Sequence, residues 1–362
     1  MSKFKVCVYA IAKNEEKFVK RWYDSIKDAD EIYVLDTGST DNTVSILKSL
    51  GVNVIEKEIV PWRFDIARNE SLKLVPDDTD ICICIDIDEI MSKGWREELE
   101  SIWNNNINLL SYNYNWNHDE KGRPLVNFYI EKIHSRNDFE WVHPVHEVLK
   151  YNGNNLVKST TDKITVDHYA DNTKSRSSYL PLLELSVKEN PTDDRNMHYL
   201  GREYMFYGKW NESIDTLIKH LSLESSTWKD ERCASMRFIA RCYKKLGRFD
   251  EAKMWLEKAI VEAPYLREPF VERAILAYEE ENWDDVLDFS FKALEIKFHP
   301  KTYINESFCW DHTVYDLMSL AYFYKGNYFE SLRYVNLALE MSPDNDRLIN
   351  NKEIIMKYYN MK

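Results

Sequence analysis

The chain has 362 residues, enough for two ordinary domains. Hydrophobic residues make up 44% of the sequence and charged residues 30%, and no stretch approaches the roughly 18 apolar residues that a membrane helix needs, which argues against a membrane span. The formal net charge of −13 argues against a nucleic-acid backbone as the main partner.

The cysteines and the first residues indicate the cellular compartment. None of the six cysteines forms a Cys-x-x-Cys pair of the metal-binding type, so we expect reduced, buried thiols and a cytoplasmic protein. The apolar run Phe4–Ile11 is short, and the charged residues from Lys13 follow at once. This pattern predicts a first strand rather than a signal peptide.

Residues up to about 170 alternate between strand and helix patterns. Strands are predicted at Phe4–Ile11, Glu31–Leu35, Val52–Glu56 and Ile81–Ile85, and helices at Lys17–Lys27, Thr43–Leu50 and Asp65–Leu74. Such alternation predicts a mostly parallel sheet covered by helices. Further strands are expected at Leu109–Trp116, Asn127–His134 and Lys163–His168, as an antiparallel extension around a site.

Beyond Pro191 the pattern is helical and a motif recurs. Related segments are Leu200–Ile214, Ile239–Lys253 and Leu320–Leu332, with a weaker copy at Ile275–Leu287. Each contains a helix, a turn and an aromatic residue before a second helix, and Gly247 and the matching Glu281 are 34 residues apart. The motif resembles the tetratricopeptide repeat, whose helix pairs stack because one pair cannot bury its apolar face alone. The alternative is an unrelated helical bundle.

An Asp-x-Asp motif follows the apolar strand at Ile81–Ile85. Asp86 and Asp88 would lie at the carboxyl end of a buried strand, where ligands collect in such sheets. Carboxylates there cost desolvation energy unless they are neutralised. A divalent cation that carries a diphosphate is one solution, because hard oxygen ligands suit Mg²⁺ or Mn²⁺. The alternative is that an aspartate caps a following helix.

Other polar residues have both a structural and a functional interpretation. Asp36 is either a turn residue or an acid at the ligand edge of the sheet. Arg68 either faces a ligand or pairs with Asp65 on the same helix face.

A histidine-containing loop and three tryptophans complete the candidates. A histidine from a distant segment, such as His168, would supply a nitrogen ligand beside the two aspartates. Glu147, next to His146, is a candidate general base. Trp62, Trp116 and Trp141 are either sugar-stacking surfaces or buried aromatic residues, and burial is the default.

Taken in order, these motifs resemble those of family 2 glycosyltransferases with the GT-A fold. The segments that carry the resemblance are Ile11–Glu16, Val34–Asp41, Phe64–Asn69, Ile85–Glu89 and Val145–Glu147. The resemblance covers residues 4 to about 170. A GT-A domain followed by tetratricopeptide helices is also the layout of bacterial peptide glycosyltransferases, among them S-glycosyltransferases. Sugar-adding enzymes of lipopolysaccharide cores share much of the first domain.

The resemblance implies a fold of class α/β plus all-α. Residues 1–172 would form a Rossmann-like GT-A catalytic domain with a mostly parallel sheet. Residues 173–190 would form a linker helix, and residues 191–362 a tetratricopeptide-type α-solenoid.

The resemblance also implies roles for individual residues. The first-strand loop (Ala12, Asn14, Glu15) would line the nucleotide pocket, with Asp36 on the base or ribose, Arg68 on the diphosphate, Asp86 on the ribose or metal, Asp88 on the metal and Glu147 as the base. His168 fits best as the final metal ligand. The chain has His146-Glu147 where the family commonly has a Glu-Asp pair, which leaves the base open and His146 as an alternative ligand.

The implied activity is metal-dependent, inverting transfer of a sugar from a nucleotide-diphosphate sugar, with UDP-sugar first among donors and Mn²⁺ or Mg²⁺ as cofactor. The acceptor would be a protein or peptide side chain or a glycan, and the repeats would bind it or a second copy in a homodimer. One alternative is an inactive scaffold that binds protein partners through its repeats. Another is a nucleotidyltransferase, which would release pyrophosphate.

Overall fold

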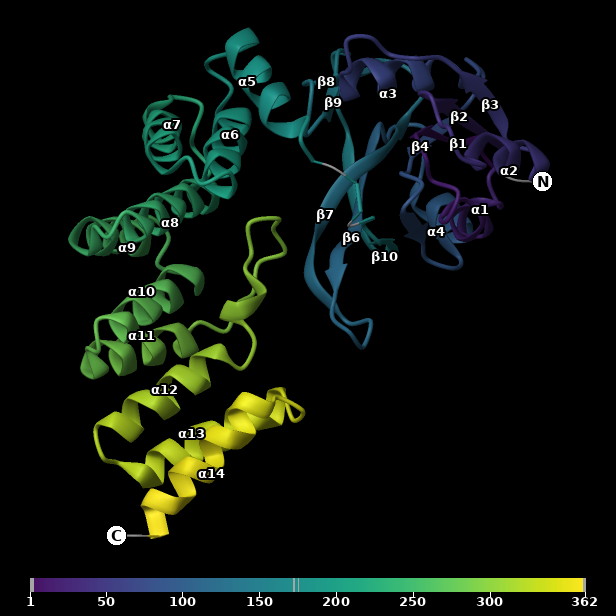
Figure 1. The fold of residues 1–362 in the computed structure, drawn as a ribbon. Helices are drawn as coiled ribbons and strands as arrows, with labels where there is room; N and C mark the ends of the chain where they lie inside the picture. Colours follow the sequence, from purple (N-terminus) through teal and green to yellow (C-terminus); the bar gives the residue numbers. More distant parts are fainter. Residues whose placement is uncertain (1–2, 172, 175, 361–362) are drawn as a thin grey trace. The chain divides into compact units, whose positions relative to one another are not determined.

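A computed structural model describes residues 3–171, 173–174 and 176–360, and the chain divides into two compact units. Unit 1 comprises Met1–Glu189 together with Lys301–Tyr303, and unit 2 comprises Asn190–Pro300 and Ile304–Lys362 (Figure 1). The domain boundary predicted at residue 172 lies outside the described residues. Helix α5 (Tyr179–Glu189), within the segment predicted as a linker, belongs to unit 1.

Unit 1 is built on a mixed sheet of eight strands in the order β3-β2-β1-β4-β7-β6-β10-β5. The strands are β1 (Val6–Ala12), β2 (Glu31–Asp36), β3 (Asn53–Glu56), β4 (Ile81–Cys84), β5 (Glu89–Met91), β6 (Leu109–His118), β7 (Pro124–Ser135) and β10 (Lys158–His168). Strands β1 to β4 pair in parallel, as the alternating pattern predicts. The buried runs of β1 and β4 are apolar because both faces of these strands are covered.

The later strands only partly follow the predicted antiparallel extension. Strand β7 pairs antiparallel with both β4 and β6, as expected. Strand β10 instead runs parallel to β6, and antiparallel to the short β5. The long connection between β7 and β10 allows this return, and it contains the separate hairpin of β8 (Phe139–Val142) and β9 (Val148–Tyr151).

The helices of unit 1 cover the sheet. They are α1 (Val19–Ile26), α2 (Thr43–Ser49), α3 (Phe64–Leu72), α4 (Trp95–Ile102) and α5. Trp22 of α1 and Trp95 of α4 are fully buried in the main core, which also contains apolar residues of β1 and β4. Helix α3 contacts β1, β2 and β8, which fixes the position of the residues described below.

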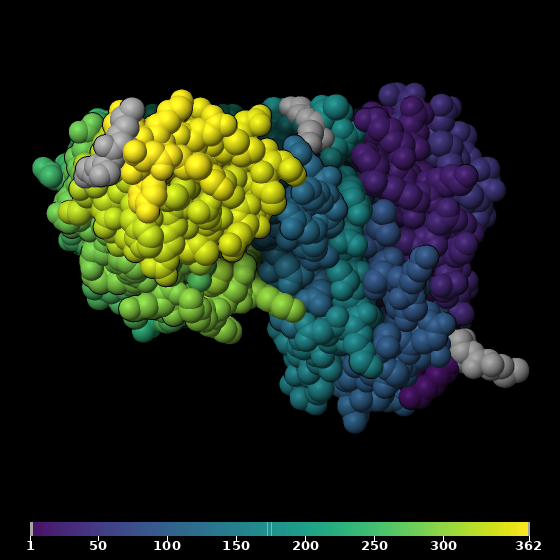
Figure 2. Space-filling view, turned by 90° about the horizontal axis from the view of Figure 1, so that it is seen from below, coloured from purple at the N-terminus to yellow at the C-terminus, as the bar shows by residue number. Residues whose placement is uncertain are grey.

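Unit 2 consists of helices that pack in consecutive pairs (Figure 1). The helices are α6 (Asp194–Phe206), α7 (Trp210–Ser222), α8 (Lys229–Lys245), α9 (Phe249–Glu262), α10 (Glu268–Glu279), α11 (Trp283–Glu295), the short η1 (Ser307–Cys309), α12 (Thr313–Tyr324), α13 (Tyr328–Met341) and α14 (Asp346–Asn360). Helix α14 packs on α13 after the last pair, and the two form a continuous surface, yellow in Figure 2.

The turns within the pairs explain the recurring glycines. Gly208, Gly247 and Gly326 have φ between +70° and +73°, a region that glycine adopts without steric cost. The weaker copy of the motif has Glu281 at this position, with φ +56°. Gly201 does not recur, since Ala240 and Ala321 stand at the equivalent positions, and a Cβ atom at Gly201 would lie 2.5 Å from the side chain of Leu217.

All six cysteines are free and buried, as the sequence predicts. Among the described residues, none of the helices combines the length and apolar character needed to cross a membrane.

Candidate active site

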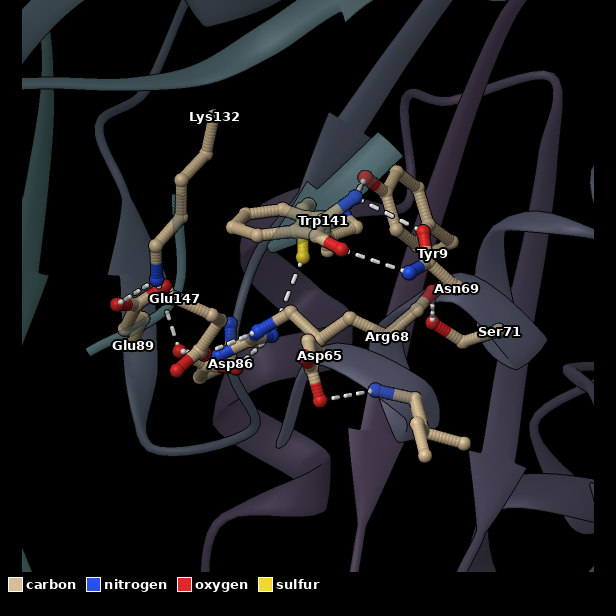
Figure 3. Close-up of polar contacts among 12 residues, drawn as sticks. Tyr9, Asp65, Arg68, Asn69, Ser71, Asp86, Glu89, Lys132, Trp141 and Glu147 are labelled. Atoms are coloured by element: carbon tan, nitrogen blue, oxygen red, sulfur yellow. Dashed lines mark hydrogen bonds and ion pairs between the residues drawn. The ribbon is translucent and has the colours of Figure 1, made fainter. Parts of the chain in front are cut away.

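Arg68 lies at the centre of a cluster of charges at the carboxyl end of β4. Its side chain is buried, with the residue only 5% exposed. Nε donates to Oε1 of Glu147 at 2.5 Å, and Nη1 and Nη2 donate to the two carboxylate oxygens of Asp86 at 2.7 and 3.0 Å (Figure 3). The two parallel bonds to Asp86 use the planar shape of the guanidinium.

The simple helix-face pair between Asp65 and Arg68 does not form. Asp65 instead pairs with Arg63, whose Nη2 lies 2.8 Å from Oδ2 of Asp65. Arg68 points the other way, and its guanidinium lies 5.1 Å from the ring centroid of Trp141 (Figure 3). The alternative of an Asp65–Arg68 pair is therefore wrong, and the functional role of Arg68 stays a prediction.

Lys132 is a second buried cation in this cluster, and sequence analysis missed it. It comes from β7, which lies beside β4 in the sheet. Its Nζ donates to Oδ2 of Asp86 at 2.8 Å and to Oε1 of Glu89 at 3.1 Å (Figure 3). Glu89 is 1% exposed, and it also accepts from the Tyr114 hydroxyl at 2.7 Å. Five charged side chains thus meet here: Arg68, Lys132, Asp86, Glu89 and Glu147, hereafter the strand-end cluster.

The charges of the strand-end cluster shift one another's pKa values. Burial alone would raise the pKa of Asp86, but Arg68 and Lys132 more than offset it and hold that pKa well below its usual value. The pKa of Glu89 is raised by burial, against the opposing effect of Lys132. Burial would lower the pKa of Lys132, yet Asp86 and Glu89 raise it well above its usual value. Both cations therefore stay charged beside the aspartate.

The β8–β9 hairpin brings Glu147 to Arg68. The side-chain amide of Asn69 on α3 accepts from the backbone N–H of Trp141 and donates to its carbonyl, both at 2.8 Å. The backbone N–H of Phe64 donates to the carbonyl of Pro144 at 2.9 Å. These bonds attach β8 and the loop after it to α3, and Glu147 is the last residue of that loop.

Trp141 also belongs to a buried chain of hydrogen bonds. Its Nε1 donates to the hydroxyl of Tyr9, and that hydroxyl lies 2.8 Å from Nε2 of His134. Nδ1 of His134 contacts the carbonyl of Ser135 at 2.8 Å, and burial lowers the pKa of His134 to about 4. A neutral His134 that accepts at Nε2 and donates at Nδ1 satisfies every bond in this chain. Trp141 is thus a buried support residue rather than a sugar platform.

Asp88 and His168 form the pair that best matches the predicted metal site. Nε2 of His168 lies 3.4 Å from Oδ2 of Asp88, while Nδ1 contacts the carbonyl of Trp116 at 2.9 Å. A backbone acceptor on Nδ1 leaves Nε2 as the coordinating nitrogen, an arrangement typical of metal-binding histidines. The His168 ring also stacks on the exposed ring of Trp116, with centroids 4.6 Å apart.

The other predicted ligands do not gather around this pair. Both oxygens of Asp86 contact Arg68 or Lys132 instead, and the His146 ring lies 5.8 Å from the ring of Tyr179. Within the described residues, three potential ligand atoms come within 4.8 Å of one another only in unit 2, at Asp194, His220 and Glu231. In unit 1, Asp88 and His168 are therefore the two predicted ligands that lie within reach of a shared ion.

The residues predicted to line the nucleotide pocket lie at the ends of β1 and β2. Ala12 pairs with Asp36 in register. Oδ1 of Asp36 accepts from the backbone N–H groups of Gly38 and Ser39 at 3.0 and 2.8 Å, so this carboxylate organises the turn after β2. The side chain of Asp36 is buried, and in this structure it acts as a turn residue.

Asn14 and Glu15 connect the first loop to its surroundings. Asn14 has φ +56°, and its side-chain oxygen accepts from the backbone N–H of Thr40 at 2.7 Å. Glu15 is paired with Lys174. Burial raises the pKa of Glu15 to about 7, against the lowering effect of Lys174.

A cavity of about 390 Å³ opens beside these strand ends. Its lining residues are Lys13, Thr37, Glu58, Ile59, Val60 and Trp62. They come from the loops after β1, β2 and β3, which is the ligand edge of such a sheet. Trp62, one of the three tryptophans considered from the sequence, therefore lines this cavity.

Two family models match the chain. The model for glycosyl transferase family 2 matches residues 7–152, and the model for a tetratricopeptide repeat matches residues 238–264. The first match spans β1 to β9 and includes all five residues of the strand-end cluster. The second covers the end of α8 and all of α9.

Curated relatives agree with the first match. A glycosyltransferase of Rickettsia bellii is 36% identical over 100 residues, which is 27% of this chain and 33% of that protein. The chain thus matches only about a third of the length of the Rickettsia relatives. The SPbeta prophage-derived glycosyltransferase SunS of Bacillus subtilis is 25% identical over 274 residues, which is 71% of this chain and 62% of that protein.

A solved tetratricopeptide repeat protein from Parabacteroides merdae covers 51% of this chain and 67% of its own, with 18% identity and a TM-score of 0.39. The repeat assignment rests on the family model and on the recurring motif rather than on this distant likeness. The resemblance stated from the motifs is confirmed, because the family 2 glycosyl transferase model matches the first part of the chain and the tetratricopeptide repeat model matches helices of the second part.

Proposed function

We propose that this protein is a metal-dependent, inverting glycosyltransferase that takes a sugar from a nucleoside-diphosphate sugar, UDP-sugar being the first candidate. The observation that carries the proposal is the buried Arg68 at the end of a central strand, bonded to both Asp86 and Glu147. The family 2 match over residues 7–152 supports the same activity. The acceptor is a side chain of a protein or peptide, or a glycan, in a cytoplasmic setting.

The donor fits the site in two parts. The nucleoside occupies the cavity beside β1 and β2, close to Asp36 and the first-strand loop. The diphosphate faces the two buried cations, Arg68 and Lys132, because their charges are the local match for phosphate oxygens. Asp88 and His168 would hold Mn²⁺ or Mg²⁺, which when bound neutralises the diphosphate as it leaves.

Glu147 is the proposed general base. Its carboxylate accepts from Nε of Arg68 at 2.5 Å. Diphosphate oxygens compete for the same guanidinium, and this competition frees the carboxylate to take a proton. Glu147 then removes the proton from the acceptor nucleophile as that atom bonds to the anomeric carbon. The bond from this carbon to the diphosphate breaks, the nucleoside diphosphate leaves, and the single displacement inverts the carbon.

A donor panel with Mn²⁺ tests the proposal. Thermal shift with UDP- and GDP-sugars should identify a donor, because a bound ligand raises the melting temperature. That donor should be hydrolysed slowly to sugar and nucleoside diphosphate. Asp88→Asn should lose this turnover, whereas the exposed repeat variant Glu257→Gln should keep it.

Two outcomes would reject the proposal. One is that no nucleotide sugar binds in the presence of either Mn²⁺ or Mg²⁺. The other is that pyrophosphate is released rather than a nucleoside diphosphate, which identifies a nucleotidyltransferase.

A further inference from the structure

A small pocket in unit 2 lies at the turn between α10 and α11. Its volume is about 360 Å³, and its lining residues are Tyr278, Glu279, Glu281, Trp283 and Tyr324. Three of these side chains are aromatic, two are carboxylates, and none is basic. The first four come from one repeat, and Tyr324 comes from the end of α12 in the next.

The aromatic side chains of the pocket pack against one another. The rings of Trp283 and Tyr324 stack with centroids 4.4 Å apart and an interplanar angle of 10°. The Tyr278 ring meets Trp283 nearly edge-on, at 5.8 Å. Tyr324 is nevertheless 58% exposed, so part of this aromatic surface remains open to a ligand. Aromatic faces attract cations through the ring quadrupole.

The charges around the pocket leave one carboxylate in excess. Glu279 accepts from Nζ of Lys244 at 2.8 Å, and the nearby Asp284 pairs with Lys325 at 2.5 Å. Each nearby lysine therefore has its own acidic partner. Glu281 is exposed, and its side chain makes neither an ion pair nor a hydrogen bond with any residue that the structure describes. A cation that entered the pocket would meet a carboxylate with no competing partner.

The backbone of Glu281 is strained. Its φ of +56° lies in the left-handed region, where the equivalent turns of three other repeats have glycine. A side chain at such a position destabilises the turn relative to glycine. Glutamate therefore costs stability here, and that cost has an explanation if the carboxylate binds something.

We propose that this pocket binds the cationic side chain of a lysine or arginine in a polypeptide partner. The charged end would lie beside Glu281, and the methylene groups would pack on Trp283 and Tyr324. A single cation over an exposed ring is held weakly, so the occupant needs further contacts, as a residue within a longer chain has. This assignment concerns binding alone and does not depend on the glycosyltransferase activity.

The test follows Trp283 in the full chain. The protein is labelled with 5-fluorotryptophan, and the Trp283 resonance is assigned with Trp283→Phe. The labelled protein is then titrated with an acetylated pentapeptide that has arginine at its centre. The control ligands are the same peptide with citrulline or norleucine in place of arginine, and free arginine amide. The variants are Glu281→Gln, Glu281→Gly and the matched control Glu280→Gln, which removes the same charge one residue away, outside the pocket lining.

The arginine peptide should shift the Trp283 resonance in a saturable way, more tightly than arginine amide and far more tightly than the neutral peptides. Both Glu281 variants should weaken binding at least tenfold, while Glu280→Gln changes it less than twofold. Glu281→Gly should also melt about 2 °C higher, because it relieves the strained turn, so its weaker binding cannot result from misfolding. Equal binding of the citrulline peptide, absence of any saturable shift, or unchanged affinity in Glu281→Gln would each overturn the proposal. Arginine amide binding as tightly as the peptide would overturn the polypeptide as occupant.

Discussion

Both units bury a cluster of acidic and basic side chains, but the two clusters differ in their balance of charge. The strand-end cluster of unit 1 has two cations and three carboxylates. In unit 2, Glu272 accepts from Arg237 at 2.7 Å and from Arg241 at 2.8 and 3.0 Å, and Arg241 also donates to Glu306 at 2.6 Å. This second group of two cations and two carboxylates, Arg237, Arg241, Glu272 and Glu306, is called the helix cluster.

The difference in balance indicates a difference in use. The helix cluster is electrically neutral and joins α8 to α10 and to the segment before η1, so it stabilises the packing of helices. The strand-end cluster has one carboxylate more than it has cations, and in the proposed function the donor diphosphate would exchange with the ion pairs of Arg68 and Lys132. Perturbed pKa values occur in both, so a shifted pKa alone does not identify an active site.

The largest effect should come from the base in the strand-end cluster. Glu147→Gln keeps a side-chain oxygen that can accept from Arg68 but removes the group that takes the proton. We expect the turnover rate to fall about 10³-fold, which corresponds to about 4 kcal/mol. Initial rates of nucleoside-diphosphate release with a saturating donor and acceptor measure this loss.

Urea unfolding supplies the control for Glu147→Gln. The free energy of unfolding should change by less than about 1 kcal/mol, because the amide preserves the contact. A variant that keeps more than a tenth of wild-type turnover would remove Glu147 from the role of base.

The helix cluster should show the opposite behaviour. Glu272→Gln leaves the buried Arg237 and the half-buried Arg241 with Glu306 as their remaining carboxylate, so one of the two positive charges is no longer neutralised. We expect the free energy of unfolding to fall by about 3 kcal/mol, as when one partner of a buried ion pair is removed. Turnover per folded molecule should be unchanged. A comparable loss of turnover at full stability would show that the helix cluster takes part in catalysis.

The helix cluster should also determine part of the acid sensitivity. Burial tends to raise the pKa of Glu272, but Arg241 and Arg237 more than offset this and lower it to about 2. Because the folded pKa lies below the unfolded value of about 4.3, the stabilisation is complete above pH 4.3 and is lost as the pH falls towards 2. The maximum contribution is about 3 kcal/mol.

Urea titrations between pH 6 and pH 2.5 measure this contribution. Wild-type stability should fall more steeply across this range than that of Glu272→Gln. Parallel curves for the two proteins would mean that Glu272 keeps an ordinary pKa in the folded protein.

The sequence predicts which residues meet at the carboxyl ends of the parallel strands, because the order of strands and helices along the chain determines this edge of the sheet. Asp86 and Asp88 directly follow an apolar run, and the crossover pattern brings β1, β2 and β4 together. The sequence also predicts that Arg68 can face the ligand edge of the sheet, but it does not identify the partner of this side chain. Arg63 and Arg68 are both close enough in the sequence to pair with Asp65, and the sequence alone does not decide between the two arginines.

The sequence does not predict that Lys132 pairs with Asp86, because this contact depends on the order of the strands within the sheet. Strand β7 follows β6 in the chain but inserts between β6 and β4, which places Ile133 opposite Ile83 and the lysine near Asp86. A lysine inside an otherwise strand-like run was the available signal. Glu89 belongs to the segment Ile85–Glu89 that contains the Asp-x-Asp motif, but this segment does not indicate that Glu89 is buried beside Tyr114 and Lys132.

The smallest effect should come from the contact that places the base, and a matched asparagine in unit 2 sharpens the comparison. Asn69→Ala removes both bonds to the backbone of Trp141, so the hairpin that carries Glu147 is held less firmly. We expect about a tenfold loss of turnover and about 1 kcal/mol less stability. Asn282→Ala removes the cap of α11, where the side chain accepts from the backbone N–H of Asp285, and should cost a similar stability.

The two asparagine variants separate positioning from stability. Asn282→Ala should keep full turnover per folded molecule, because it loosens only a helix of unit 2. In Asn69→Ala the maximal rate should fall while the affinity for donor stays within about twofold, since the cavity and Arg68 are intact. Equal turnover in the two variants would mean that the bonds between α3 and the hairpin stabilise unit 1 without placing Glu147, and the strand-end cluster would then owe its geometry to the ion pairs of Arg68 alone.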